Sequence, residues 1–183
     1  DVMRGEEVQI FGVLALSGLR NARVVLPGTH SKWAEVTDGR ITGFRSFMTG
    51  EVYALLSQHS ILSRTLAVDA PWHEAAFVQA VQLAQRTPSV LSSIFSTRTL
   101  SLFSTLPAEQ HSSYLSGLLI GEELRAMGAT AHSPDSPLLV VGNAVLCARY
   151  TSALQALGHT ARPFGDEATW AGHRALAHHL ENA

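Results

Sequence analysis

The segment LPGTHSKW, residues 26–33, concentrates residue types that bind anions. It follows an apolar run and contains Lys32, the only lysine of the chain. Glycine lets a backbone approach an anion closely, hydroxyl and amide groups can hydrogen-bond its oxygens, and a lysine ammonium acts as a point charge for phosphate. On these residues alone, a plain β-hairpin whose lysine faces water is the simpler interpretation. The alternative is a phosphate-binding loop formed by Gly28, Thr29, His30, Ser31 and Lys32.

Two further segments contain residues that could take part in catalysis or ligand binding. Glu6 and Glu7 follow Gly5 at the start of a predicted helix, where a carboxylate could accept a proton from a substrate hydroxyl or hold a hydrated metal. The alternative is simple stabilisation of the helix N-terminus by acidic side chains. Gly142 and Asn143 end an apolar run and precede a helix, and ligands of open α/β sheets collect at that edge. Many such junctions bind nothing.

The elements that must position these residues form an α/β pattern. A helix is expected over 4–17, followed by a three-stranded meander over 23–28, 32–37 and 40–48, with a hairpin turn at Asp38-Gly39 and a bulge near Gly43. Thr49 is the expected N-cap of a helix over about 51–59. Further helices are expected over 71–86, 88–105 and 107–127, the first and last opened by proline. The rest of the chain is expected to form a loop over 133–137, a buried strand over 138–143, a helix over 144–157, a strand over 160–163 and a helix over 166–181.

Composition narrows the classes of partner. The net charge of −2 shows no excess of positive charge of the kind that binds nucleic acid. No apolar run approaches the roughly 18 residues that a membrane-spanning helix needs. A single cysteine, Cys147, is expected to be a buried structural thiol in a reducing compartment, so we expect a cytoplasmic protein. The nine histidines show no spacing typical of zinc, and no metal ligands are predicted.

Four strings resemble the 2-dehydro-3-deoxygalactonokinases, and the resemblance runs through Val141-Gly142 to the closing GDEA of residues 165–168. These strings are DVMRGEE (1–7), LPGTHSKW (26–33), FRSFMTGE (44–51) and LSGLLIGE (115–122). Members of this family phosphorylate the terminal hydroxyl of 2-dehydro-3-deoxy-D-galactonate with ATP and Mg²⁺, in galactonate catabolism. The resemblance implies a sugar acid and ATP as substrates. A homodimer is an expected oligomeric state.

The resemblance also implies a fold. The superfamily of sugar kinases, hexokinase and actin has two lobes built on ribonuclease-H-like sheets, with ATP and sugar in the cleft between them. We therefore expect residues 1–183 to form one C-terminal α/β lobe with a mixed sheet and flanking helices. Within it we expect an entry helix over 1–22, the meander and a helix over 23–60, a helical insertion over 71–128 and a nucleotide-side βαβα segment over 137–183.

Roles for single residues follow from the same resemblance. The turn 28–31 would contact the β- and γ-phosphates, and Lys32 would neutralise phosphate charge, although the strand after the turn could equally point it away. Glu6 falls near the catalytic aspartate of related sugar kinases, with Glu7 or Asp1 as alternatives. The implied binding residues are Arg4, Arg45, Thr49 and Glu51 for the sugar acid, and Gly142, Asn143 and Ala144 for adenosine. For Arg45, a plain position on the strand surface is the alternative.

One departure from the family pattern limits these expectations. Full-length members open with a strand and a first phosphate loop of the form Asp-Trp-Gly-Thr-Thr-Asn, and nothing like it occurs in the 183 residues. We therefore expect the chain to lack an N-terminal segment and to be a poor kinase alone, because phosphoryl transfer needs charge stabilisation from both sides. The alternatives are a kinase for another 2-keto-3-deoxy sugar acid and a non-catalytic, nucleotide-binding actin-like module.

Overall fold

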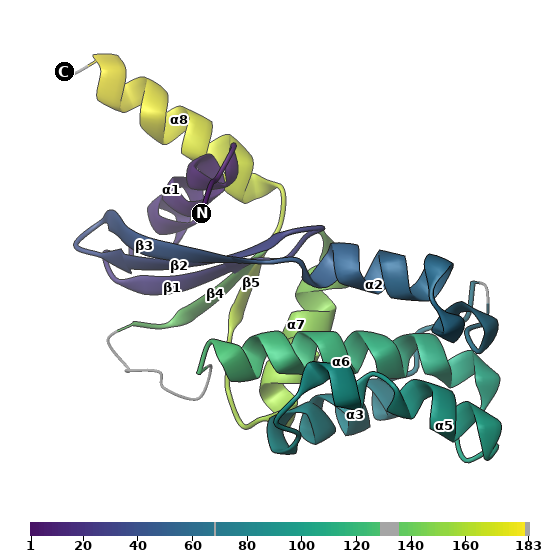
Figure 1. Cartoon of the computed structure of the whole chain (residues 1–183). Helices are drawn as coiled ribbons and strands as arrows, with labels where there is room; N and C mark the ends of the chain where they lie inside the picture. Colours follow the sequence, from purple (N-terminus) through teal and green to yellow (C-terminus); the bar gives the residue numbers. More distant parts are fainter. Residues whose placement is uncertain (68, 129–135, 182–183) are drawn as a thin grey trace. The chain divides into compact units, whose positions relative to one another are not determined.

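The computed structural model of the chain describes residues 1–67, 69–128 and 136–181 and divides into two compact units (Figure 1). Unit 1 comprises Asp1–Phe47, Ala131–Thr151 and Thr160–Ala183, and unit 2 comprises Met48–Thr130 and Ser152–His159. Three residues of the predicted loop 133–137, namely 133–135, lie outside the described part. The predicted division of the chain into four segments of one lobe stays a prediction.

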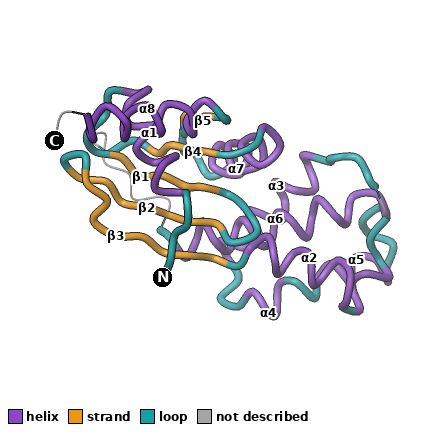
Figure 2. The backbone as a smooth tube through the Cα atoms, turned by 90° about the horizontal axis from the view of Figure 1, so that it is seen from above, coloured by secondary structure: helices purple, strands orange, loops and turns teal. Residues whose placement is uncertain are grey.

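Unit 1 is built on a mixed five-stranded sheet, in the order β3-β2-β1-β4-β5 (Figure 2). The first three strands form the predicted antiparallel meander: β1 (Ala22–Leu26), β2 (Ser31–Thr37) and β3 (Arg40–Phe47). The strand β4 (Leu138–Val141) lies parallel to β1, and β5 (Arg162–Phe164) lies parallel to β4. With helices packed on it, this sheet confirms the predicted α/β fold class.

The meander is shaped by two local features that the sequence predicts. Asp38 and Gly39 both have positive φ, at 52° and 76°, as the two-residue hairpin turn of the mirror-image type requires. The bulge near Gly43 is also confirmed, because Glu35 pairs with Gly43 while the next residue of β2 pairs with Ile41. Thr42 is therefore the extra residue of β3.

Helices α1 (Glu6–Ser17) and α8 (Glu167–Glu181) cross in direct backbone contact in unit 1 (Figure 1). A Cβ placed on Gly12 would lie 1.7 Å from the carbonyl oxygen of Ala168, and one on Gly172 would lie 2.0 Å from that of Val8. Only glycine permits this approach. The apolar side of α1 and alternate residues of the strands share one core, formed by Ile10, Val13, Leu14, Ala22, Val24, Leu26, Ala34, Val36, Leu139, Val141 and Ala168.

Unit 2 contains the helices α2 (Thr49–His59), η1 (Ile61–Arg64), α3 (Glu74–Arg86), α4 (Val90–Ser93), α5 (Ser96–Leu102), η2 (Ala108–Gln110) and α6 (His111–Ala126), together with the segment Ser152–His159. Its closest pair is α3 and α6. A Cβ on Gly117 would lie 2.3 Å from the carbonyl oxygen of Phe77, and one on Gly121 would lie 2.8 Å from the Cβ of Ala84. These two glycines, four residues apart on α6, permit the close approach of the two helices.

Several helix starts differ from the expectation. The helix α3 begins at Glu74, three residues after the proline that was expected to open it, because the ring of His73 accepts the backbone N–H of Ala76 and caps it. The proline before α6 is followed by the turn of η2, and residues 88–105 form two short helices in place of one. The last helices, α7 (Ala144–Ala156) and α8, match the prediction within about a residue.

Candidate functional site

Three loops of unit 1 meet at one edge of the sheet, because β1, β4 and β5 are parallel and end there. These loops are the segment 27–30 after β1, the Gly142-Asn143 turn after β4 and the segment 165–166 after β5. Gly142 donates its N–H to the carbonyl oxygen of Phe164 at 3.0 Å. A Cβ on Gly142 would lie 3.7 Å from the ring of Pro27. The structure therefore brings the predicted phosphate loop and the predicted adenosine turn together.

The predicted phosphate loop is open to solvent at its tip. Thr29 and His30 are exposed and Gly28 is half-buried, whereas Ser31 is fully buried at the start of β2. A Cβ added to Gly28 would meet only the carbonyl oxygen of His30, at 4.0 Å, and its φ lies outside the left-handed region. Neither packing nor backbone conformation therefore requires glycine at position 28.

Lys32 is directed away from that open tip. Residues two apart on a strand share a face, so Lys32 lies on the same side of the sheet as Ala34 and Val36, whose side chains belong to the core beneath α1. Lys32 is 5% exposed. Its ammonium donates to the carbonyl oxygen of His30 at 3.2 Å and lies 3.5 Å from the carboxylate of Glu6.

The side chains of Glu6 and Glu7 both accept backbone N–H groups of the residues just before α1. Glu6 accepts the backbone N–H of Arg4 at 2.6 Å, and Glu7 accepts that of Gly5 at 2.9 Å. Burial raises the pKa of Glu6, but the backbone hydrogen bonds from Arg4 and from its own N–H, together with the charge of Lys32, outweigh it and hold the pKa below its ordinary value. Glu6 is therefore an ionised hydrogen-bond acceptor at neutral pH and a weak base.

The Gly142-Asn143 turn begins helix α7. Asn143 accepts the backbone N–H of Leu146 at 2.9 Å and so acts as the N-cap, and both Asn143 and Ala144 are exposed. The added Cβ at Gly142 would make only contacts of 3.7 Å or longer. Cys147 lies beneath the turn, 6% exposed, as predicted, and burial raises its pKa.

The two predicted arginines lie in different surroundings. Arg45 of β3 is exposed and pairs directly opposite Trp33, and directly opposite residues share a face of the sheet. Arg45 therefore lies on the face opposite to Lys32. Arg4 is exposed just before α1, and its backbone holds Glu6. Of the two, Arg4 is the one that lies beside the predicted carboxylates.

The remaining predicted residues, Thr49 and Glu51, belong to unit 2. Thr49 is not the N-cap of α2: the helix already includes it, and Met48 occupies the cap position without a side-chain bond. The Thr49 hydroxyl instead donates a short hydrogen bond to the carboxylate of Glu123. Glu51 lies in the first turn of α2, where its charge stabilises the helix.

Sequence reasoning missed Glu123, a carboxylate that is only 1% exposed. A signal was present, because Glu123 continues the i, i+4 spacing of Leu115 and Leu119 on the buried side of α6. An acidic residue in an apolar helical stripe needs a hydrogen-bond donor inside the protein. Only the fold identifies Thr49 as that donor.

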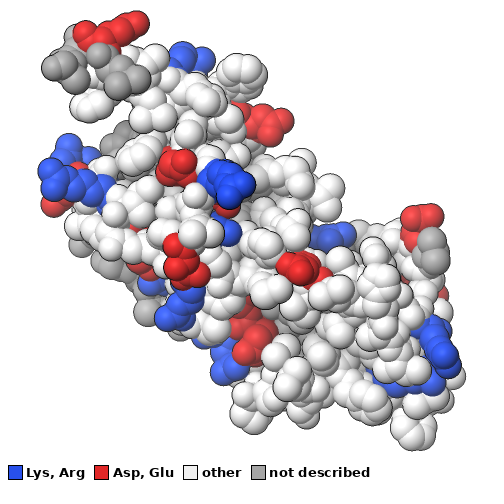
Figure 3. All heavy atoms as spheres, turned by 45° about the horizontal axis from the view of Figure 1, so that its top comes forward, with Lys and Arg blue, Asp and Glu red and all other residues white. Residues whose placement is uncertain are grey.

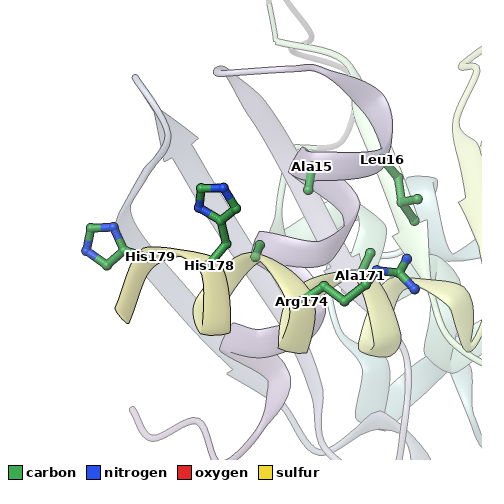
Figure 4. Close-up of a pocket in the computed structure, with 7 residues that line it drawn as sticks. Ala15, Leu16, Ala171, Arg174, His178 and His179 are labelled. Atoms are coloured by element: carbon green, nitrogen blue, oxygen red, sulfur yellow. The ribbon is translucent and has the colours of Figure 1, made fainter. Parts of the chain in front are cut away.

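An open pocket of about 570 Å³ lies between α1 and α8 in unit 1 (Figure 4). Its lining is formed by Ala15, Leu16, Ala171, Arg174, Ala175, His178 and His179. The pocket lies near the C-terminal end of α1, nine or ten residues from Glu6, which at the rise of an α-helix is about 14 Å along its axis. No predicted site residue lines it.

The described residues contain no group of three or more His, Cys, Asp or Glu side chains that could hold a metal ion. Among the helices of the described part, none is long and apolar enough to cross a membrane. On the face drawn in Figure 3, acidic and basic side chains are dispersed among uncharged ones.

Comparison with known proteins relates these features to one family. The family profile described as 2-keto-3-deoxy-galactonokinase matches residues 1–176. The chain is 39% identical to 2-dehydro-3-deoxygalactonokinase of Escherichia coli (strain K12), over 100% of this chain and 61% of that protein. It is also 39% identical to the probable 2-dehydro-3-deoxygalactonokinase DgoK1 of Rhizobium meliloti (strain 1021), over 97% of this chain and 59% of that protein.

A solved structure gives the same result. A crystal structure from Sinorhizobium meliloti, of a protein provisionally named 2-dehydro-3-deoxygalactonokinase, superposes with a TM-score of 0.90 at 38% identity, covering 98% of this chain and 61% of that one. The chain thus spans about 60% of the length of the relatives that it matches. On the profile match and these similarities, the chain belongs to the 2-keto-3-deoxy-galactonokinase family.

Proposed function

We propose that the chain is part of a kinase that transfers the γ-phosphoryl group of ATP to the terminal hydroxyl of 2-dehydro-3-deoxy-D-galactonate, giving the 6-phosphate. The observation that carries this proposal is a pair of glycines at the carboxyl edge of the parallel strands. Gly28 and Gly142 lie in neighbouring loops, and neither is required by the packing or the backbone conformation of the protein itself. Glycines of this kind are explained by a ligand that approaches the backbone closely.

The roles proposed for the site residues are those that the family resemblance implies, and the neighbouring positions of the two loops support them. The loop 28–31 would surround the β- and γ-phosphates with backbone N–H and hydroxyl groups. The turn formed by Gly142, Asn143 and Ala144 would face the adenosine. The two loops lie side by side, as one nucleotide that contacts both requires.

The acceptor side of the reaction would use the start of α1. Glu6 or Glu7 would accept a hydrogen bond from the sugar hydroxyl and orient it toward the phosphorus atom, because phosphoryl transfer depends mainly on positioning and charge stabilisation. Arg4 lies beside these carboxylates and would pair with the carboxylate of the sugar acid. Arg45, Thr49 and Glu51 stay predicted substrate contacts.

Mg²⁺ would be bound mainly through the nucleotide. The ion keeps several waters and commonly uses one or two carboxylates plus substrate phosphates. The described residues offer no cluster of three or more ligands, and Glu6 is already engaged by Lys32 and by the Arg4 N–H. The chain therefore supplies no dedicated cage for the ion in its described part.

We expect the isolated chain to be less active than the longer relatives that it matches. The matched relatives are longer, and this chain spans 61% of the Escherichia coli protein. Both sides of the transferred phosphoryl group need stabilisation. We propose that the 183-residue chain alone binds nucleotide weakly and turns over little. A cytoplasmic location and a homodimer stay predictions.

A coupled assay of ADP formation tests the proposal. ATP and 2-dehydro-3-deoxy-D-galactonate are supplied to this chain and to a chain extended to the length of its relatives, with the gluconate epimer as the control substrate. Activity in the extended protein that prefers the galactonate acid is the expected result. A preference for the epimer would reassign the substrate. No ADP with either acid, together with tight ATP binding, would favour a non-catalytic nucleotide-binding module.

A further inference from the structure

The single lysine of the chain lies within the phosphate-loop motif, but its side chain does not enter the loop's open side. Alternation along β2 places Lys32 on the face covered by α1, with Ala34 and with Leu26 directly opposite on β1. We propose that Lys32 is a positioning residue that ties the phosphate loop to the carboxylate of Glu6, and that it is not a ligand of the phosphate. This inference rests on the proposed kinase function.

Burial argues against a direct phosphate contact. The Lys32 side chain is 7% exposed, whereas an ammonium that neutralises an incoming phosphate must reach the ligand. A lysine ammonium is a compact, strongly hydrated charge with three donors, and here two of its neighbours are the His30 carbonyl oxygen at 3.2 Å and the Glu6 carboxylate at 3.5 Å. A phosphate that took the place of Glu6 beside Lys32 would leave that partly buried carboxylate without its cation.

The bond to His30 acts on the loop itself. A carbonyl oxygen carries partial negative charge and would repel a phosphate that it faced. Because the His30 carbonyl is held by the Lys32 ammonium, it is turned toward the interior of unit 1. Lys32 therefore selects the loop conformation without touching the ligand.

The pairing with Glu6 acts on the other half of the reaction. Both oxygens of the Glu6 carboxylate are engaged, one by the Arg4 N–H at 2.6 Å and the other by Lys32 at 3.5 Å. Two contacts from different directions hold the group in one orientation. Orientation of reacting groups is a large part of what an enzyme contributes to a transfer reaction. Removal of Lys32 should therefore impair the chemical step more than the binding of ATP.

The test is a double-mutant cycle in the full-length enzyme with Lys32→Met, Glu6→Gln and the pair together, with Lys32→Arg added as the conservative variant. The positioning role predicts that Lys32→Met lowers kcat on the order of 100-fold and leaves the KM for ATP within about twofold. It also predicts that Lys32→Met has little further effect in the Glu6→Gln background. Lys32→Arg should recover part of kcat, because it keeps the charge and the donors.

Glu35→Gln is the matched control. Glu35 forms an ion pair with Arg23 at 2.6 Å in the same sheet, but it lies on the opposite face of β2 from Lys32. This variant should leave kcat and KM unchanged. The proposal is overturned if Lys32→Met raises the KM for ATP and the dissociation constant of a non-hydrolysable ATP analogue about tenfold or more, equally with and without the Glu6 carboxylate, because that is the behaviour of a phosphate ligand.

A second measurement needs no turnover. The Glu6 carboxyl can be titrated by ¹³C NMR in the wild-type protein and in Lys32→Met, once the Lys32→Met chain is shown by circular dichroism to be folded. An upward shift of the Glu6 pKa in the variant supports the pairing, and an unchanged value overturns it. If wild-type enzyme fails to phosphorylate any 2-keto-3-deoxy sugar acid, the proposed function fails, and this titration still decides whether Lys32 holds Glu6.

Discussion

Gly12 on α1 is the position in unit 1 where a single added methyl group should have the largest effect. A Cβ there would lie 1.7 Å from the carbonyl oxygen of Ala168 and 2.7 Å from the backbone nitrogen of Gly172. Ordinary contact begins at 3.4 Å, so the helices would have to separate by 1.7 Å, the difference between 3.4 Å and 1.7 Å. Because both obstacles are backbone atoms, no side chain can rotate away to make room.

The magnitude follows from two opposing terms. Overpacking a close contact costs about 1–3 kcal/mol, and the upper end applies when backbone must move. Alanine is about 1 kcal/mol more favourable than glycine in a helix interior, and this difference offsets part of the cost. The net loss for Gly12→Ala is therefore about 2 kcal/mol. In a chain of this size about 1 kcal/mol lowers the Tm by about 2–4 °C, so we expect a fall of about 4–8 °C.

Thermal unfolding followed by circular dichroism measures this change, with Gly43→Ala as the control. Gly43 has no atom within 4 Å of an added Cβ, and its φ lies outside the left-handed region, so its variant should keep the wild-type Tm. Displacement of α1 should also move Glu6 away from Lys32. A Gly12→Ala protein with an unchanged or higher Tm would refute the backbone contact between α1 and α8.

Three further results are expected. Gly28→Ala and Gly142→Ala should keep the wild-type Tm but weaken binding of an ATP analogue by about tenfold, or about 1.4 kcal/mol, measured by calorimetry, because a methyl group occupies space that the ligand needs. Thr49→Val should destabilise unit 2 by about 1–3 kcal/mol, since it removes a donor from the buried carboxylate of Glu123, whereas Thr49→Ser should not; denaturant unfolding distinguishes them. Glu6→Gln should remove part of the acid sensitivity of stability, measured as Tm against pH.

The sign of the pH effect follows from the depressed pKa of Glu6. A carboxyl whose pKa is lower in the folded than in the unfolded protein stabilises the fold above its ordinary pKa of 4.5, and this contribution disappears as pH falls through the folded value. Wild-type and Glu6→Gln proteins should therefore differ most near neutral pH and converge as the pH falls below 4.5 and through the lower folded-state pKa of Glu6. Curves that stay parallel down to low pH would contradict the backbone hydrogen bonds and the Lys32 charge that lower the pKa of Glu6. Equal ATP affinity in Gly28→Ala and wild type would contradict the phosphate loop.

The order of elements could be predicted from local patterns. Alternating apolar residues and the Asp38-Gly39 pair specify the meander, because side-chain period and turn chemistry are properties of adjacent residues. The apolar run 138–141 specifies a strand buried on both faces, and it lies between β1 and β5 as such a run requires. The family strings likewise predicted membership that the profile match confirms.

Helix starts were less predictable, because a cap depends on which polar group reaches the first turn. The proline at position 71 suggested the start of α3, but the ring of His73 caps it three residues later. Threonine is a residue type that often caps helices, but the Thr49 hydroxyl donates its hydrogen bond to Glu123, a residue 74 positions away. No local pattern contains such a partner.

The sequence by itself determined the strand-turn-strand character of the phosphate loop, the strand that precedes Gly142 and the acidic start of α1. Only the tertiary structure decided that these three segments meet and that the lysine of the loop is bonded to Glu6. The period of a strand assigns Lys32 to one face or the other, but only the packing of α1 onto that face turns the lysine into an interior ion pair.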